Sequence, residues 1–267
     1  MNIKNTQPAL VPEQRLEQIL DLLSTMSFAS ISDLAASLNV SEMTIRRDLD
    51  KLESKGHIRR THGGVVSESK TQIELDYITR QKRQSQEKDI IGKLASGLVE
   101  DGQSVFVDAG TTTLSMAKYL KKFRNIKVIT NSLPVQTEFL DNNIEIFLIG
   151  GRVLTHTLSL VGTLAQENLS TMRFDWAFLG TGGIDLKRGL THSTMEEIPI
   201  KRAAAASANK VVVLVDSTKF GYNALSQIMP ISSVQYIVTD KLPKGIDKDA
   251  LSKDGVKLIW ELPTQSS

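Results

Sequence analysis

Two adjacent arginines, Arg46 and Arg47, are the side chains with the most distinctive chemistry in the N-terminal part of the sequence. A guanidinium group can donate two parallel hydrogen bonds to guanine O6 and N7, and it also pairs with phosphate. Ser41 and Thr44 can donate to phosphate at the start of the helix that we expect to carry the arginines. These residue types together predict contacts with double-stranded DNA. The candidate DNA-contacting residues are Ser41, Met43, Thr44, Arg46, Arg47, Lys51, Arg59, Arg60 and His62.

Three short helical patterns would position these residues. Apolar side chains recur at helical spacing from Leu16 to Leu23 and again from Ile31 to Leu38. A third pattern begins after Ser41, which is a good N-cap residue, and its apolar stripe runs from Ile45 to Leu52. Gly56 is suited to the end of this third helix.

A glycine-centred hairpin is expected directly after the third helix. Ile58-Arg59-Arg60-Thr61 and Val65-Val66 flank the pair Gly63-Gly64. An arginine pair by itself more often lies on a solvated helix face. Three correctly spaced helices followed by a hairpin make DNA contact the favoured interpretation of the arginine pair. In that arrangement a tight turn positions the second helix of a pair to enter a major groove. We therefore predict a winged helix-turn-helix domain over residues 1–66.

A second chemically distinctive motif is Asp108-Ala109-Gly110-Thr111-Thr112-Thr113. It follows a predicted strand and opens a predicted helix. Glycine lets a backbone approach a ligand closely, and free N–H groups with hydroxyls suit an anion such as phosphate. Taken alone, the motif is equally well explained as an ordinary strand–helix turn capped by threonine.

Short β-rich runs alternate with helical segments from about residue 104 onward. This alternation predicts an α/β domain with a largely parallel sheet. Ligands of such sheets bind outside the carboxyl ends of the strands. The predicted strands contain Val105 to Val107, Lys127 to Thr130, Ile146 to Ile149, Trp176 to Leu179, Val211 to Val215 and Tyr236 to Val238.

Polar, basic and glycine residues follow several of these strands. Each has an ordinary explanation by itself, Lys219 as a surface lysine and Arg152 as an exposed loop residue, for example. Because the carboxyl ends of parallel strands converge on one edge, their joint occurrence favours a binding site. The candidate effector-binding residues are Asp108, Gly110, Thr111, Thr112, Thr113, Asn131, Gly151, Arg152, Asp185 and Lys219.

The run from Val40 to Leu49, with Arg60-Thr61-His62-Gly63-Gly64 after it, resembles the DeoR family of bacterial transcriptional regulators. The resemblance continues in the same order over nearly the whole chain, through Asp108 to Thr113, Thr130-Asn131, Gly150-Gly151, Gly180 to Asp185, Gly189 to Thr191 and Asp216 to Phe220. It implies a C-terminal domain that is similar to ribose-phosphate isomerase and glucosamine-phosphate deaminase folds and that senses a phosphorylated sugar. It also implies that Gly110 to Thr113 hold the phosphate, with Asp108, Asn131, Asp185 and Lys219 around the sugar.

The alternative is an active sugar-phosphate isomerase with an accessory DNA-binding head. Isomerisation needs a positioned base, for which Asp185 and the Glu196-Glu197 pair are the candidates. Ribose-phosphate isomerases carry a lysine–glycine-rich stretch and a glutamate soon after their aspartate pair, and the run from Leu186 to Thr191 lacks that arrangement. Glu196 and Glu197 suit the first turn of a helix that leads into Lys201-Arg202. We therefore expect no catalytic residues and no enzyme.

The composition of the chain limits which other classes of protein remain possible. The 267 residues contain no cysteine, which removes disulfides, thiol catalysis and cysteine-ligated metals. The four histidines lack metal-ligand spacing, so we expect neither a metal nor a cofactor. The formal net charge is only +2, so the prediction of DNA binding depends on where the basic side chains lie rather than on their number. A polar N-terminus and short apolar runs indicate a cytoplasmic protein with no membrane segment.

The expected organisation is a DNA-binding domain over 1–66, a linker over 67–86 and an α/β sugar-phosphate sensor and oligomerisation domain over 87–267. We expect a transcriptional regulator, a repressor of a carbohydrate-metabolism operon, that leaves its operator when a phosphorylated sugar binds. Because paired recognition helices match repeated half-sites, we also expect a homo-oligomer, either a dimer or a tetramer.

Overall fold

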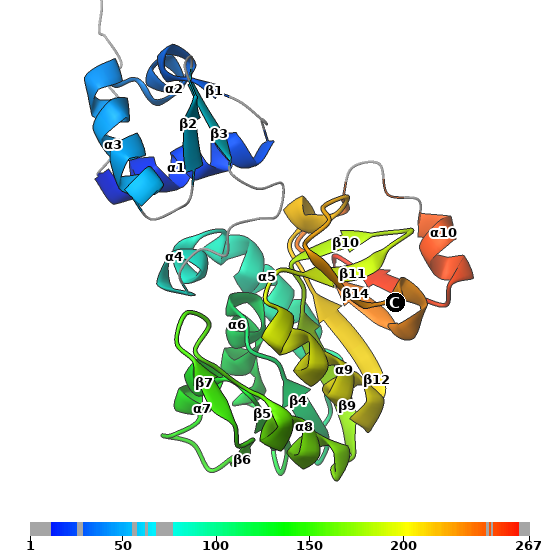
Figure 1. Ribbon diagram of the computed structural model, residues 1–267. Helices are drawn as coiled ribbons and strands as arrows, with labels where there is room; N and C mark the ends of the chain where they lie inside the picture. The colour runs from blue at the N-terminus through cyan, green and yellow to red at the C-terminus, as the bar shows by residue number, and fades with distance from the viewer. Residues whose placement is uncertain are drawn as a thin grey trace, which may run out of the picture. The chain divides into compact units, whose positions relative to one another are not determined.

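The computed structural model describes residues 12–25, 29–54, 58–61, 64–67, 77–243, 246 and 248–261. The chain divides into two compact units, Met1–Ile73 and Glu74–Ser267. Each unit has its own layers and its own buried core, and Figure 1 labels their elements.

The first unit is a three-helix domain with a small antiparallel sheet in the order β1-β3-β2. The three predicted helices and the hairpin of β2 and β3 are confirmed, while the two-residue strand β1 was not predicted. Residues 55–57, 62 and 63, which include Gly56, His62 and Gly63, lie outside the described residues. The elements are α1 (Pro12–Thr25), β1 (Ala29–Ser30), α2 (Ile31–Leu38), α3 (Glu42–Ser54), β2 (Ile58–Thr61) and β3 (Gly64–Ser67).

The core of the first unit is formed by the apolar stripes that the sequence shows. Ile45, Leu49 and Leu52 of α3 are buried against α1, α2 and the hairpin. A buried ion pair between Arg15 of α1 and Asp48 of α3 lies beside this core. Removing either partner would leave the other charge buried, so this pair fixes how α3 lies on α1.

The second unit is built on a seven-stranded sheet in the order β15-β14-β12-β9-β4-β5-β6, in which every neighbouring pair is parallel. All six predicted strands are present, and β15 at one edge is an addition. The strands are β4 (Ser104–Val107), β5 (Lys127–Thr130), β6 (Glu145–Leu148), β9 (Phe174–Gly180), β12 (Ala208–Leu214), β14 (Tyr236–Val238) and β15 (Lys257–Ile259).

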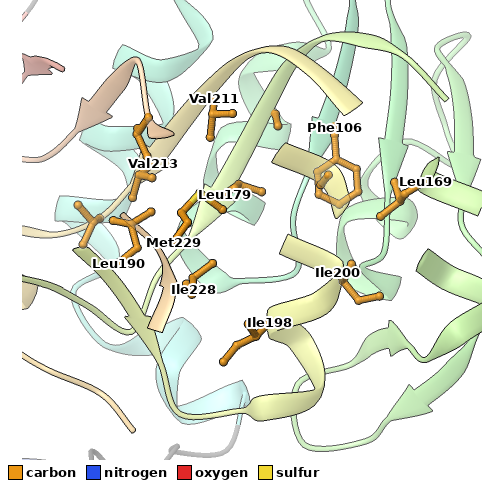
Figure 2. Packing of buried hydrophobic residues seen from close by; sticks show 14 of the residues in the cluster. Phe106, Leu169, Leu179, Leu190, Ile198, Ile200, Val211, Val213, Ile228 and Met229 are labelled. Atoms are coloured by element: carbon orange, nitrogen blue, oxygen red, sulfur yellow. The ribbon is translucent and has the colours of Figure 1, made fainter. Parts of the chain in front are cut away.

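Helices cover both faces of this sheet (Figure 1). Successive strand residues alternate between the faces, as a pleated strand requires. Phe106 and Leu179 pack in one core, shown in part in Figure 2, and Val107 and Phe178 pack in the other. The first face is covered by α8 (Thr163–Ser170), α9 (Ile198–Ser207) and α10 (Lys248–Lys253), and the second by α5 (Ser85–Ser96), α6 (Thr111–Leu120) and α7 (Leu133–Glu138).

Smaller elements are inserted between the strands and helices of the main sheet, and the sequence did not predict them. Gly183, at the start of β10, is a close-approach position, because a Cβ there would lie 2.2 Å from the Tyr222 carbonyl oxygen. The inserted elements are the β7 (Arg152–Leu154) and β8 (Ser159–Val161) ribbon, the β10 (Gly183–Asp185), β11 (Gly189–His192) and β13 (Ser226–Met229) sheet, and the 3₁₀ turns η1 (Met195–Glu197), η2 (Ser217–Lys219) and η3 (Ile231–Ser233).

The expected linker over 67–86 is too long at its C-terminal end. Helix α4 (Tyr77–Lys82) belongs to the second unit, where Tyr77 is buried in the core on the α5–α6 face. Gln84, directly before α5, also belongs to the second unit, where its side-chain amide lies 3.5 Å from the Thr218 hydroxyl. The charged composition of this segment concealed a short helix whose Tyr77 side chain is buried in the core. Among the described residues, no helix is long and apolar enough to cross a membrane.

Candidate functional sites

Helix α3 begins at a cap formed by Ser41. The Thr44 backbone N–H donates to the Ser41 hydroxyl oxygen at 3.2 Å, and the two hydroxyl oxygens are 2.8 Å apart. This is the N-cap geometry that the sequence predicted for Ser41. Both hydroxyls therefore lie at the helix N-terminus, where backbone N–H groups and the helix dipole favour a phosphate.

The predicted DNA-facing side chains share the exposed side of α3. Met43 is 61% exposed, and Arg46, Arg47 and Lys51 are exposed as well. Arg46 pairs with Glu42 at 3.5 Å, and both side chains are about half exposed. An exposed pair of this kind contributes little stability, so a phosphate can replace the carboxylate.

Arg60 is held by α3 instead of projecting from the hairpin. Its guanidinium donates to the Arg46 carbonyl oxygen at 2.5 Å and pairs with Asp50 at 2.9 Å and Glu53 at 3.6 Å. These bonds dock β2 against α3, and the role of Arg60 as a DNA contact stays a prediction. Arg59 lies in β2, and His62 lies outside the described residues.

In the second unit, the carboxyl ends of β4, β5 and β9 meet around Asp108. The Gly180 N–H donates to Asp108 Oδ2 at 2.9 Å, and the Ala109 N–H donates to Asn131 Oδ1 at 2.9 Å. Asp108 and Asn131 are both buried. The parallel sheet thus brings these two predicted residues together, as the strand-end argument requires.

The start of α6 lies at the same edge. Gly110 is its N-cap, with an extended backbone at φ 173°. Thr113 is fully buried, and its hydroxyl donates to the carbonyl oxygens of Asp108 (2.7 Å) and Gly110 (2.9 Å), so it fixes the turn. Thr111 is buried and Thr112 is half-buried. The first backbone N–H groups of a helix lack intrahelical partners and favour an anion.

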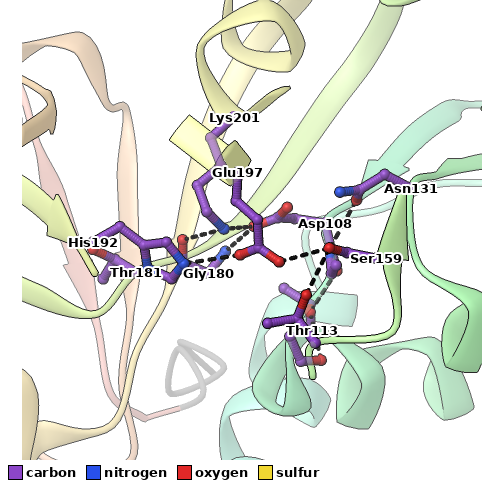
Figure 3. Close-up of polar contacts among 12 residues, drawn as sticks. Asp108, Thr113, Asn131, Ser159, Gly180, Thr181, His192, Glu197 and Lys201 are labelled. Carbon is purple, nitrogen blue, oxygen red and sulfur yellow. Dashed lines mark hydrogen bonds and ion pairs between the residues drawn. The ribbon is translucent and has the colours of Figure 1, made fainter. Parts of the chain in front are cut away.

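Two charged residues missing from the sequence prediction complete this centre (Figure 3). The Lys201 ammonium contacts the Asp108 carboxylate and donates to the Gly180 carbonyl oxygen at 3.2 Å, and both ionic side chains are 1% exposed. Glu197 accepts hydrogen bonds from His192 Nε2 at 2.8 Å and from Ser159 at 2.7 Å. We call these residues, Asp108, Ser159, His192, Glu197 and Lys201, the buried polar centre.

Electrostatics in the buried polar centre favour an ionised Glu197. Burial disfavours its charge, but the hydrogen bond from His192 and the nearby charge of Lys201 outweigh burial and hold the pKa of Glu197 well below its ordinary value. Burial raises the pKa of Asp108, and the Lys201 ammonium opposes that rise. Asp108 Oδ1 is buried and has no hydrogen-bond partner among the described residues.

The remaining predicted effector residues are Gly151, Arg152, Asp185 and Lys219. Asp185 accepts N–H hydrogen bonds from Lys187 and Arg188, both at 2.8 Å, so it closes the β10–β11 turn, and its role in binding an effector stays a prediction. These bonds lower the pKa of Asp185. Arg152 is exposed and lies 4.0 Å from Glu196. Gly151 has a left-handed φ of 147°, and Lys219 is the half-buried last residue of η2.

Comparisons with known proteins agree with this two-part organisation. The family description "DeoR-like helix-turn-helix domain" matches residues 15–71, and "DeoR C terminal sensor domain" matches residues 83–241. The chain belongs to the DeoR family of transcriptional regulators. Its winged helix and its α/β sensor therefore make up the two domains of a DeoR-type regulator.

Relatives of this DeoR-family chain are named as regulators. The HTH-type transcriptional repressor GlcR of Bacillus subtilis (strain 168) is 36% identical over 248 residues, covering 92% of this chain and 95% of that protein. The lactose phosphotransferase system repressor of Lactococcus lactis subsp. lactis is 39% identical over 212 residues, covering 78% and 83%. A D-ribose-5-phosphate isomerase in complex with phospho-erythronic acid is similar at 18% identity, a TM-score of 0.39 and coverages of 51% and 54%.

The isomerase alternative is not supported. The curated relatives are named as transcriptional regulators and repressors, and the chain is a regulator and not an enzyme. The carboxylates near the site also have other partners, since Glu197 is bonded to His192 and Ser159 and Asp185 closes a turn. Among the described residues, no group of three His, Cys, Asp or Glu side chains is arranged to hold a metal ion.

Proposed function

We propose that this regulator is a repressor whose helix α3 reads an operator, and that a phosphorylated sugar at the carboxyl edge of the sensor sheet releases it. The observation that carries the effector proposal is the meeting of Asp108, Asn131 and the start of α6 at that edge. Anion-binding N–H groups and buried groups that bond hydroxyls are thus placed side by side, as a sugar phosphate requires.

The phosphate end of the ligand is assigned to the first turn of α6. Gly110 brings the backbone close without a side chain, and Thr111 and Thr112 add N–H groups and hydroxyls. Lys219, at the end of η2, supplies a positive charge from the strand β12 side. Thr113 supports the turn from inside, because its hydroxyl already bonds the Asp108 carbonyl oxygen.

The sugar end is assigned to the buried polar centre. Asp108 Oδ1 is a buried acceptor without a partner among the described residues, and a sugar hydroxyl would satisfy it. Lys201 holds the other oxygen of the same carboxylate in place. A site that leaves a buried acceptor unpaired discriminates strongly for a ligand with a hydroxyl at that point.

Repression and a carbohydrate target are supported by the relatives. One is named a transcriptional repressor and another a repressor of a lactose phosphotransferase system. We also propose that the regulator acts as a homo-oligomer, because two recognition helices on a two-fold axis match a repeated operator half-site.

A gel-shift assay with operator DNA and individual sugar phosphates tests this function. We expect glucose 6-phosphate, fructose 1-phosphate, fructose 6-phosphate or ribose 5-phosphate to weaken operator binding, whereas the unphosphorylated sugars do not. Lys219→Ala should raise the concentration needed for release about tenfold, the loss of one charge-assisted contact. The control is Lys187→Ala, an exposed lysine on the β10–β11 turn. If release is unchanged in Lys219→Ala, the effector binds elsewhere; if no sugar phosphate releases the DNA, the effector class is wrong.

A further inference from the structure

The segment that leads from the DNA-binding unit into the sensor contacts a loop at the proposed effector site. Helix α4 is the first described element after residue 67, and residues 83 and 84 join it to α5. We call Arg83 and Gln84 the α4–α5 junction. The loop is the η2 turn, Asp216 to Lys219, which follows strand β12 and ends in the lysine assigned to the phosphate.

Lys88 ties the two helices of this segment together. Its side chain is buried in α5, and its ammonium donates to the carbonyl oxygens of Arg80 and, at 2.5 Å, of Arg83. These carbonyls lie at the end of α4, where a positive charge stabilises the last turn of a helix. Helix α4 is therefore held to α5 by one buried lysine.

Gln84 links the junction to the η2 turn. Its backbone is left-handed, with φ 52°, a conformation that a glutamine rarely adopts. The side-chain amide lies beside Asp216, and when the amide is oriented with its nitrogen toward that carboxylate it donates at 3.2 Å to each carboxylate oxygen. Asp216 is buried and caps the η2 turn by accepting from the Thr218 N–H at 3.1 Å. A single carboxylate thus holds both the turn and the junction.

The charges of the same residues are coupled. Burial lowers the pKa of Lys88 to about 8, with Asp216 opposing the fall and Arg80, Lys219 and Arg83 adding to it. The positive charge of Lys219 is therefore felt at Lys88. An anion bound to Lys219 would offset that charge and strengthen the hold of Lys88 on the end of α4.

The η2 turn is also joined to the rest of the sensor. Ser217 N–H donates to Asp240 at 2.6 Å, beyond strand β14, and the Gly221 N–H donates to the Ile184 carbonyl oxygen at 2.8 Å. A shift of the turn on ligand binding is therefore constrained on two sides. The contact of the turn with Gln84, and the hold of Lys88 on the carbonyl oxygens of Arg80 and Arg83, give that shift a route to α4.

We propose that Gln84 and Lys88 are the positioning residues that transmit effector binding from the η2 turn to the DNA-binding unit. The inference rests on the proposed function of the carboxyl edge as the effector site. When an anion engages Lys219, Asp216 changes its contact with Gln84 and its electrostatic interaction with Lys88, and α4 takes a different position. The effector and operator DNA then both act on α4, an element with two arrangements, which is the physical requirement for coupling between their sites.

The test uses the full-length chain and measures the coupling between sugar-phosphate binding and operator binding separately from the affinity for either ligand. Gln84→Asn keeps a residue that tolerates the left-handed backbone but shortens the amide, and Lys88→Met keeps the length of the side chain but removes its charge. The matched controls are Gln86→Asn and Lys93→Met, both at exposed positions of α5. Operator Kd is measured by gel shift without and with the sugar phosphate that releases the wild type most strongly.

We expect the ratio of the two operator Kd values to fall about fivefold in Gln84→Asn and Lys88→Met and to stay unchanged in the controls. Operator affinity without the sugar phosphate should stay within about twofold of wild type, and Lys88→Arg should restore most of the ratio. Equal ratios in Gln84→Asn and wild type would overturn the junction as the route while leaving the effector site intact. A wild type that no sugar phosphate releases would instead overturn the proposed function and this inference together.

Discussion

Lys201 and Asp108 form an ion pair that is almost completely removed from water. Desolvating two charges costs about as much as their attraction returns, so a buried pair is weak evidence for a stabilising role. Each partner here also bonds the backbone at a strand end, Asp108 the Gly180 N–H and Lys201 the Gly180 carbonyl oxygen. The pair therefore shapes the carboxyl edge, where we propose that the effector binds.

Glu197 gives this centre a predictable dependence on pH. Its pKa is lower in the folded protein than the ordinary value of 4.5, so its stabilising effect is fully present above pH 4.5 and is lost as the pH falls below that value. Glu197→Gln should destabilise the sensor at pH 7 by roughly 3 kcal/mol, because it removes one partner of a buried charge network. Urea denaturation followed by circular dichroism at several pH values measures this difference.

The difference between wild type and Glu197→Gln should shrink as the pH is lowered through the range below 4.5. Glu196→Gln is the matched control, because Glu196 is the residue next to Glu197 and its own carboxylate is half exposed, 4.0 Å from Arg152. A difference that is the same at pH 7 and at pH 3 would show that Glu197 does not carry its charge in the folded protein.

Sequence reasoning found the residues of the site that follow an apolar strand and missed those on a helix. Asp108 and Asn131 each come directly after a predicted strand, so the topology alone places them at one edge. Glu197 and Lys201 are four residues apart, a spacing that is most often a solvent-exposed helix pair. Their burial depends on where α9 lies over the sheet, which no local pattern in the sequence specifies.

At the scale of the element, α3 presents one apolar and one basic side, and the arginines can be tested on that basis. Arg47 is exposed on the side opposite Ile45 and Leu49. Arg47→Ala should weaken operator binding about 5- to 150-fold, the loss expected for one contact to a base edge or several to phosphate. The sensor should still bind its effector, because the substitution lies outside that unit.

Fluorescence anisotropy with labelled operator measures this loss, and repeating it at several salt concentrations separates the two kinds of contact. A phosphate contact reduces the salt slope by about one, whereas a base contact relaxes sequence preference. Lys118→Ala, an exposed lysine of α6, is the control for a change in net charge. Equal operator affinity in Arg47→Ala and wild type would exclude the exposed side of α3 as the recognition surface.

Elements with a strong periodic pattern were predicted, and short elements held by tertiary contacts were not. Helices α1, α2 and α3 each carry a full apolar stripe, and six sheet strands are continuous apolar runs. Strand β1 has only two residues and exists because it pairs with β3 at Ala29 and Val65. In helix α4 the buried residue Tyr77 lies in a polar and charged segment whose sequence shows no apolar periodicity.

The whole molecule contains two units with separate cores, and the chain itself joins them. The core of the first unit contains residues up to Val65, and both cores of the second begin at Tyr77 or later. The chain that joins the units is one route by which a change of ligand state in one unit can reach the other. The contact of Gln84 with Asp216 lies at the sensor end of this route.

Thermodynamic linkage gives the prediction that belongs to the whole molecule. If a sugar phosphate weakens operator binding by some factor, operator DNA must weaken sugar-phosphate binding by the same factor, expected at about 5- to 150-fold. Isothermal titration of the sugar phosphate into the free protein and into the protein–operator complex measures the second factor, and gel shift measures the first. Scrambled DNA of equal length is the control, because it retains phosphate contacts without the specific site. Unequal factors would mean that sugar phosphate and operator are not linked through one equilibrium, and that release proceeds by another process, such as dissociation of the oligomer.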